Sequence, residues 1–180
     1  MKKINMYYVN MKLIRDYSKV DDKVMSVSPQ SNKQARPHLG IIVINDGVKY
    51  VIPLSSPKEK YKKKSSIDLI KIFDEKIKDD RGTYKIIGVL NINNMIPVND
   101  WYIQKVDLVI HKNDSAKMKA YKELLQNQLK WCRKNSNLIY RRVEKVYKLV
   151  TEAPDKDRSL VRRSVDFKKL EEILNKKEMK

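Results

Sequence analysis

The fold is decided by residues 39–52, which read LGIIVINDGVKYVI. Two runs rich in β-branched residues, 39–44 and 48–52, flank the turn sequence NDG at 45–47. An Asp-Gly pair between two such runs is a strong local signal for a tight β-hairpin. This stretch therefore predicts two antiparallel strands joined by a short turn. Further strands of a sheet can then pair with these two.

Three other segments have the composition of strands. They are residues 4–10, 84–92 and 101–110, in which Ile, Val and Tyr are frequent. A short helix is expected from Met11 to Lys19, and residues 20–38, with prolines and scattered Asp, Asn and Ser, predict a long loop. The first half of the chain is therefore expected to be rich in β-structure.

One stretch of the first half has a different period. Apolar residues at positions 67, 69, 70, 72, 73 and 77 fall at helical spacing. We therefore expect a helix from Ile67 to Ile77, ended by the acidic cluster at 74–80 and by Gly82.

The second half of the chain is helical by its apolar spacing. The apolar residues of a first helix are Met118, Tyr121, Leu125, Leu129 and Cys132. Their steps of three and four predict a helix that is capped near Asn113 or Asp114. A second helix is expected after a cap at Ser136, and a third around Leu170. Strands followed by helices predict an α+β fold, in which helices pack against an antiparallel sheet.

The charge of the chain is strongly positive. Its 180 residues include 40 Lys and Arg against 22 Asp and Glu, a formal net charge of +18. A polyanion relieves such self-repulsion and releases its own condensed counterions, so we expect the partner to be a nucleic acid. An anionic membrane surface is the alternative partner, but the sequence has neither a basic amphipathic helix with bulky anchors nor a lipid-attachment motif.

The composition also indicates the class of protein. With 41% hydrophobic residues, 4 Gly and 6 Pro, the chain is typical of a globular protein, and residues 1–180 are expected to form a single domain. A single cysteine, Cys132, excludes an internal disulfide. We see neither a signal peptide nor an apolar run long enough to cross a membrane, so we predict a cytoplasmic protein with no membrane partner.

Several catalytic classes lack the residues that they need. The acidic side chains are scattered or lie in the run 74–80, which argues against a metal-dependent nuclease. The two histidines, His38 and His111, stand in no motif, and the glycines are isolated, so no phosphate-binding glycine loop is found. The recognition-helix motif of a DNA-binding factor is also missing. We expect neither a metal nor a cofactor.

The remaining candidate site follows the hairpin. Residues 53–58 read PLSSPK, so Ser55, Ser56 and Lys58 lie at the end of the second strand. One interpretation is a capping box, with Ser56 as the N-cap of a helix and Glu59 three residues later. Another is an anion site, because a helix N-terminus presents free N–H groups to a phosphate. The lysines that surround this segment are Lys60, Lys62, Lys63 and Lys64.

Four stretches of the sequence resemble a known family. They are YY at 7–8, RPHLGI at 36–41, KYVIPLSSPK at 49–58 and GVLNINNMIP at 88–97. Together with the basic segment QLKWCRKN at 128–135, they resemble the ToxN/AbiQ endoribonuclease toxins of type III toxin-antitoxin and phage-defence systems. The resemblance covers residues 1 to about 140, and the tail from about 151 is not matched to the family.

The resemblance implies a compact twisted β-core related to the Kid/MazF toxins, and a metal-independent cut through RNA that leaves a 2′,3′-cyclic phosphate. It places the catalytic serine at Ser56, its hydroxyl neighbour at Ser55, the motif lysine at Lys58 and the basic residue before the hairpin at Arg36. Some members of the family have lysine at this last position. Arginine keeps the charge but is not a plausible proton shuttle, which argues against an acid-base role for Arg36.

In such a reaction the 2′-OH of the RNA is the nucleophile, so the protein has to position and neutralise the phosphate. Arg36 and Lys58 are expected to hold the extra charge of the phosphorane, and Ser56 with backbone N–H groups its oxygens. Lys58 and His38 are the candidates for proton transfer. For His38 the alternative interpretation, a surface or strand-entry histidine, is favoured.

A charge of +18 exceeds what a small groove needs, so a second basic face is expected. We predict that Lys117, Lys119 and Lys122 bind RNA, and that Tyr121 either stacks on a base or packs in the core. The resemblance implies two RNA partners, namely cellular or phage RNA as substrate and a small structured antitoxin RNA with pseudoknot-like repeats. This second RNA is expected to close an assembly of several toxin and RNA subunits. The alternative function is a basic RNA-binding module that does not cut.

Overall fold

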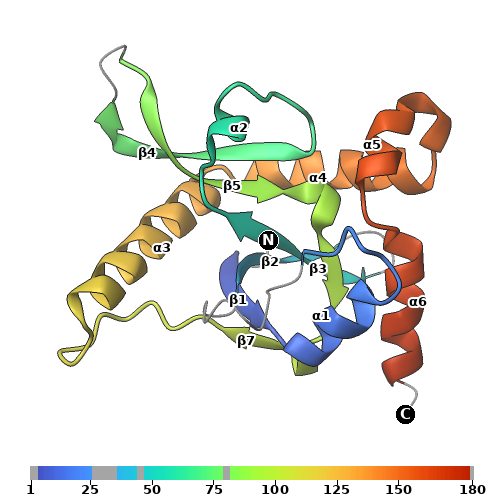
Figure 1. Ribbon diagram of the computed structural model, residues 1–180, viewed down its shortest axis with the longest axis horizontal. Helices are drawn as coiled ribbons and strands as arrows, with labels where there is room; N and C mark the ends of the chain where they lie inside the picture. The colour runs from blue at the N-terminus through green and yellow to red at the C-terminus, as the bar shows by residue number, and fades with distance from the viewer. Residues whose placement is uncertain (1–3, 26–35, 44–46, 79–81, 179–180) are drawn as a thin grey trace.

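The computed structural model describes residues 4–25, 36–43, 47–78 and 82–178. Within these ranges seven strands form one antiparallel sheet, and the long helices of the second half lie against it (Figure 1). The strands are β1 (Asn5–Val9), β2 (Pro37–Val43), β3 (Lys49–Ser55), β4 (Leu69–Lys78), β5 (Tyr84–Asn91), β6 (Ile96–Val98) and β7 (Ile103–Lys105). The helices are α1 (Met11–Ser18), α2 (Glu59–Lys62), α3 (Ala116–Lys134), α4 (Ser136–Thr151), α5 (Arg158–Arg163) and α6 (Phe167–Glu178), with the 3-10 turns η3 (Ile92–Asn94), η4 (Asp100–Tyr102) and η5 (Pro154–Asp157). The expected α+β fold, with a mostly helical second half, is confirmed.

Strands β2 and β3 form the predicted antiparallel hairpin, in which Leu39 pairs with Ile52. Positions 45 and 46 of the expected turn lie outside the described residues, and Gly47, which follows them, has a φ of 80°, a conformation that favours glycine. Gly40 brings the two strands close together, because a Cβ at this position would lie 2.6 Å from Cγ1 of Val51. The hairpin is therefore held tightly where it enters the core.

Strand β3 lies at the centre of the sheet. The strand order is β4-β5-β3-β2-β1-β7, and β6 also pairs with β3. The first half of β3, from Lys49 to Val51, pairs with β6, whereas Leu54 and Ser55 pair with β5. The last residues of β3 consequently lie between β2 on one side and β5 on the other.

Residues 69–77 belong to strand β4, so the helix expected at 67–77 is wrong. Strand β4 pairs with β5 from Leu69 to Asp74 and again at Lys78, and it is covered on both faces near its start. Leu69 packs with Tyr61 and Val89, whereas Ile70 and Ile72 belong to the main core. A strand that is buried on both faces lacks the alternation of apolar and polar residues, and its apolar positions can then match a helical period.

The three predicted helices of the second half are confirmed as α3, α4 and α6, whereas α5 was not expected. Helix α3 begins after Ser115, whose hydroxyl accepts a hydrogen bond from the N–H of Met118 over 3.2 Å. Helix α4 includes Ser136, and its N-cap is Asn135. No helix of the described ranges is long and apolar enough to cross a membrane.

The strand expected at 101–110 is limited to the three residues of β7, which pair with β1. The N–H of Val106 still donates to the carbonyl of Met6 in β1, but after Val106 the backbone carbonyls bond to side chains of α3. The carbonyl of Leu108 accepts from Gln126, and that of Val109 accepts from Lys122. These side-chain bonds replace a sheet ladder, so residues 106–115 form a loop against α3.

Helix α6 is anchored on the sheet through a buried carboxylate. Oε1 of Glu171 accepts hydrogen bonds from the hydroxyls of Tyr50 in β3 and Tyr147 in α4, each over 2.7 Å. The ring of Phe167 packs against both tyrosine rings, with centroids 6.0 and 5.7 Å away. Burial, together with Glu171, raises the pKa of Tyr50, so its hydroxyl stays protonated and donates. The contact ties the C-terminal helix to the central strand.

We predict that Glu171→Ala destabilises the protein, because it leaves two buried tyrosine hydroxyls without an acceptor. Each such group costs about 1–3 kcal/mol, so the free energy of unfolding in urea falls by about 2–5 kcal/mol. The exposed neighbour Glu172 provides the control, since Glu172→Ala is expected to change stability by less than about 0.5 kcal/mol. Equal stability of the two variants would contradict this role of Glu171.

Candidate active site

The candidate site lies where strand β3 ends. Ser55 is the last residue of β3, and Ser56 and Lys58 after it are exposed. Helix α2 starts only at Glu59, with Lys58 as its N-cap and no side chain capping it. The expected capping box at Ser56 is therefore wrong, because the chain first turns, with the N–H of Lys58 donating to the carbonyl of Ser56 over 2.9 Å. A helix of 4 residues also has little of the dipole on which the anion-site interpretation rests.

The hydroxyl of Ser55 is held by two donors from opposite sides. Nη1 of Arg36, the residue before β2, donates to Oγ over 2.9 Å. Nδ2 of Asn91, the last residue of β5, donates to the same oxygen over 3.0 Å. A serine hydroxyl has two acceptor positions and one proton, so both acceptor positions of Ser55 are in use. Its proton is consequently left to donate to a third group.

Arg36 is a half-buried cation. Among the residues that the structure describes, no carboxylate lies within ion-pair distance of its guanidinium, and its buried Nε has no hydrogen-bond partner. Burial lowers the pKa of Arg36, and the nearby Tyr61 opposes this effect. An arginine keeps its charge at neutral pH in any case. A half-buried charge without a counterion favours the binding of an anion.

The lysines after Ser56 lie on the surface beside this cluster. Lys58, Lys60, Lys62, Lys63 and Lys64 are all exposed. The ammonium of Lys62 pairs with Glu59 over 2.5 Å, and that of Lys60 lies 5.0 Å from the centre of the Tyr61 ring. This segment therefore adds exposed positive charge after Ser56, whereas the charge of Arg36 is half-buried.

Asn91 is the site residue that the sequence reasoning missed. Its side chain is 6% exposed, and it lies in the stretch GVLNINNMIP that carries part of the family resemblance. A buried amide needs hydrogen-bond partners, so an asparagine at the end of an apolar strand is a signal that could have been used. Its partner, Ser55, follows only from the pairing of β5 with β3.

His38 is buried in the sheet, with 2% of its surface exposed. It is a residue of β2, as the strand-entry interpretation predicts, and its ring Nδ1 lies 3.0 Å from the carbonyl of Arg36, to which it donates. Burial lowers the pKa of His38 to about 4. The proposed role in proton transfer therefore does not fit His38, since its ring is covered and neutral.

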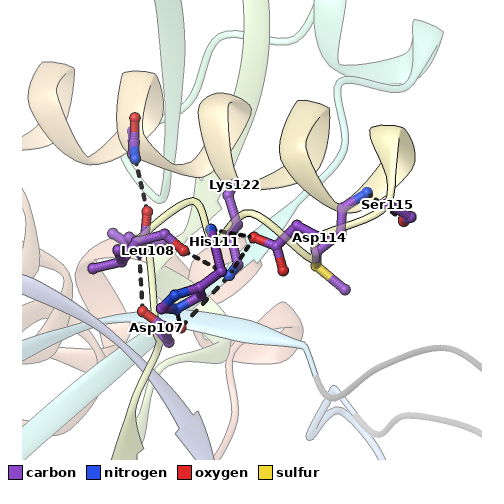
Figure 2. Close-up of polar contacts among 9 residues, drawn as sticks. Asp107, Leu108, His111, Asp114, Ser115 and Lys122 are labelled. Carbon is purple, nitrogen blue, oxygen red and sulfur yellow. Dashed lines mark hydrogen bonds and ion pairs between the residues drawn. The ribbon is translucent and has the colours of Figure 1, made fainter.

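The contacts of Lys122 argue against its predicted role in RNA binding. Its side chain is buried, and its ammonium bonds to Asp114 over 2.9 Å, to the carbonyl of Val109 over 2.6 Å, and lies 3.5 Å from Asp107 (Figure 2). His111 also bonds to Asp107, over 2.8 Å. Lys122 therefore fastens the loop 106–115 to α3, and its charge is compensated within the protein.

The other predicted residues of α3 differ in exposure. Lys117 is exposed and Lys119 half-buried, and neither forms an ion pair with a carboxylate in the described ranges. Tyr121 is half-buried, packs against the main core, and its pKa is raised to about 12 by burial and by Tyr8. The structure thus supports the core-packing interpretation of Tyr121.

The arrangement can bind and orient a phosphodiester. Arg36 supplies a positive charge, and Ser55 supplies a hydroxyl proton of fixed direction. Ser56 and Lys58, which lie within three residues after Ser55, supply exposed polar groups. Within the part of the chain that the structure describes, no group of three or more His, Cys, Asp or Glu side chains is placed to hold a metal ion.

The fold and the sequence of the chain are those of a family of RNA-cleaving toxins. Residues 5–175 match the family described as "Toxin ToxN, type III toxin-antitoxin system". The Endoribonuclease ToxN of Bacillus thuringiensis subsp. kurstaki is 32% identical over 146 residues, which cover 79% of this chain and 69% of that protein. The chain therefore belongs to the ToxN family of endoribonuclease toxins, and the resemblance found in the sequence is confirmed.

Solved structures agree with this assignment. One, described as showing "selective toxin inhibition by a non-coding RNA pseudoknot", superposes with a TM-score of 0.82 at 27% identity over 99% of this chain and 100% of that chain. The lactococcal anti-phage endoribonuclease AbiQ has a TM-score of 0.80 at 24% identity over 99% of each chain, and so shares the fold. The family match includes residues 151–175, which the sequence resemblance did not cover.

We predict that His38 makes stability depend on pH. Its pKa is about 4 in the folded chain and 6.5 when unperturbed, so below pH 6.5 the unfolded chain binds a proton that the folded chain does not. Stability present at neutral pH is therefore lost as the pH falls toward 4. Between pH 7 and pH 5 the contribution of His38 to the free energy of unfolding is expected to fall by about 2 kcal/mol.

The control is His38→Asn, in which the amide nitrogen can replace Nδ1 as donor to the Arg36 carbonyl but does not titrate. Urea unfolding at pH 7 and pH 5 is expected to show a smaller loss of stability in this variant than in the wild type. An equal loss in both proteins would mean that His38 is not the group that titrates.

Proposed function

We propose that the protein cuts RNA sequence-selectively at the end of β3 without a metal ion. The observation that carries this proposal is the hydroxyl of Ser55, which accepts hydrogen bonds from Arg36 and Asn91. Arg36 is itself a cation that has no counterion among the described residues. In the reaction, the 2′-oxygen attacks the adjacent phosphorus and the bond from phosphorus to the 5′-oxygen breaks. The 2′-OH loses its proton, the leaving 5′-oxygen gains one, and the products are a 2′,3′-cyclic phosphate and a 5′-OH.

Each side chain has a role in this scheme. Arg36 neutralises the charge that grows on the phosphorane, and the free proton of Ser55 is donated to a non-bridging oxygen. Ser56, as the family's catalytic serine, contacts the phosphate from the exposed side, together with Lys58. Because His38 is buried and neutral, Lys58 is the remaining candidate for proton transfer.

The proposed inhibitor is a small structured RNA. The charge of +18 and the solved relative whose description names a non-coding RNA pseudoknot support this partner. We propose that Lys60, Lys62, Lys63 and Lys64 contact RNA beside the site, and that Lys117 and Lys119 contact it on α3. Lys122 is left out because its charge is already paired. An RNA that bridges neighbouring subunits would close an assembly and cover the site.

The proposed setting is the cytoplasm, where both RNA partners are found. The lone Cys132 is buried, which fits a reducing compartment. Cleavage of cellular or phage RNA by a toxin that is released from its antitoxin would serve phage defence.

The test is cleavage of a mixed-sequence RNA in excess EDTA, compared between the wild type, Ser56→Ala and the control Ser65→Ala. Ser65 is an exposed serine outside the site. We expect the wild type and Ser65→Ala to cut in EDTA and to give cyclic-phosphate ends by mass spectrometry. Ser56→Ala is expected to fold and to cut at least about 100-fold more slowly, as for loss of one transition-state contact.

Three outcomes would contradict the proposal. Activity that is lost in EDTA and restored by Mg²⁺ would indicate a metal site. A mobility shift of the RNA without any cleavage would favour the RNA-binding module. Full activity of folded Ser56→Ala would remove Ser56 from the mechanism.

A further inference from the structure

Trp101 is the most exposed large apolar side chain among the described residues, with 89% of its surface in contact with solvent. The other tryptophan of the chain, Trp131, is half-buried, and its ring centre lies 6.2 Å from that of Phe73. Single exposed apolar residues are common on proteins, but tryptophan is mostly buried. An indole ring as exposed as that of Trp101 is therefore available to a partner.

The backbone that carries Trp101 is fixed on both sides. Within η4, the N–H of Trp101 donates to Oδ1 of Asn99 over 3.2 Å. Asp100 pairs with Lys49 of β3 over 2.5 Å, and the carbonyl of Tyr102 accepts from the N–H of Asn10 over 2.8 Å. The ring is thus presented from a held turn, which reduces the conformational entropy that a ligand would have to remove.

Cations lie next to this turn on helix α1. Asn10, which is bonded to Tyr102, is the N-cap of α1, and Figure 1 shows α1 beside the segment that leads into β7. Lys12 and Arg15 of α1 are exposed and three positions apart, so they share one face of the helix. Among the described residues neither forms an ion pair with a carboxylate, but Asp16, which is paired with Lys177 and Lys19, also attracts Lys12.

We propose that Trp101, Lys12 and Arg15 form a second RNA-binding surface, on which an unpaired base stacks on the indole and the two cations contact flanking phosphates. An exposed aromatic ring and exposed cations on neighbouring elements suit single-stranded RNA, because every base has a face to stack and every linkage a charge. This inference rests on the proposed function, since it takes RNA to be the ligand of the protein.

The surface is separate from the site at Ser55. Lys49, which holds Asp100, is the first residue of β3, and Ser55 is the last, so β3 separates the two regions by about 20 Å. RNA that reaches both places extends well beyond the linkage that is cut. The surface therefore contributes to holding a long RNA and not to the cleavage step.

Fluorescence of Trp101 tests the proposal. In Trp131→Phe, Trp101 is the only tryptophan, and the substituted ring can still pack on Phe73. The probe is a mixed-sequence, fully 2′-O-methylated single-stranded RNA, which has no free 2′-OH and is not cut. We expect this strand to quench Trp101, and an abasic phosphate backbone of equal length to leave its emission nearly unchanged.

Affinity for the same strand is then compared among variants of the full chain. Trp101→Ala is expected to bind about 10-fold more weakly, the usual size of one lost base stack. The double change Lys12→Glu with Arg15→Glu is expected to weaken binding and to lower its salt dependence. Matched controls are Tyr84→Ala, another exposed aromatic, and Lys145→Glu, an exposed lysine of α4, which are expected to bind as the wild type does.

Two results would overturn the inference: emission of Trp101 that does not change at saturating RNA, or binding by Trp101→Ala as tight as that of the wild type. Emission that changes with protein concentration alone would also overturn it, because the occupant would then be a second copy of the chain. Because the methylated strand is never cut, a wild type that binds it through Trp101 but cleaves no RNA supports this surface and contradicts only the proposed function.

Discussion

The position of Ser55 between two neighbouring strands is the constraint on which the site depends. Its hydroxyl meets a donor from the residue before β2 and another from the end of β5, which lie 19 and 36 positions away in the sequence. Only a sheet in which β3 pairs with both strands brings these three side chains together. The close approach of β2 and β3 at Gly40 and the burial of β3 serve the same geometry, because they fix the strand end that carries the serines.

The C-terminal helices stabilise this sheet from outside the site. Glu171 of α6 bonds to Tyr50 in β3, and Arg163 of α5 forms a two-point ion pair with Asp68, near the start of β4. Burial acts to raise the pKa of Asp68, but hydrogen bonds, the largest of them from Arg163, and the Arg163 charge together lower it, so the carboxylate stays charged. The last third of the chain is therefore part of the fold, in agreement with a family match that extends to residue 175.

Local sequence signals predicted the elements that depend on local interactions. The hairpin around 45–47 and the three long helices of the second half follow from turn residues and apolar spacing. Strand β4 was mistaken for a helix because tertiary packing on both of its faces removed the alternation of a strand. The sequence pattern of a capping box is the same whether a helix starts at Ser56 or a turn comes before the helix. The pattern therefore predicts a cap at Ser56, where the structure has a turn.

The site could be predicted only in part for the same reason. The segment with Ser55, Ser56 and Lys58 and the residue Arg36 came from motifs, whereas Asn91 acts through a strand pairing that the sequence does not display. The net charge also overstates how many cations are available to RNA. Lys122 adds to the net charge, but its ammonium is bonded to Asp114 and Val109 of the loop 106–115. The number of lysines on a helix does not state how many of them are free for RNA.

The most direct test of the account is a double-mutant cycle of Asn91→Ala and Ser55→Ala, measured as kcat for cleavage of a short RNA by folded protein. If Asn91 acts by orienting the Ser55 hydroxyl, each single change lowers kcat by about 10-fold or more, and adding Asn91→Ala to Ser55→Ala causes little further loss. If the double variant instead loses the product of the two single effects, Asn91 and Ser55 act independently, and the central claim is contradicted.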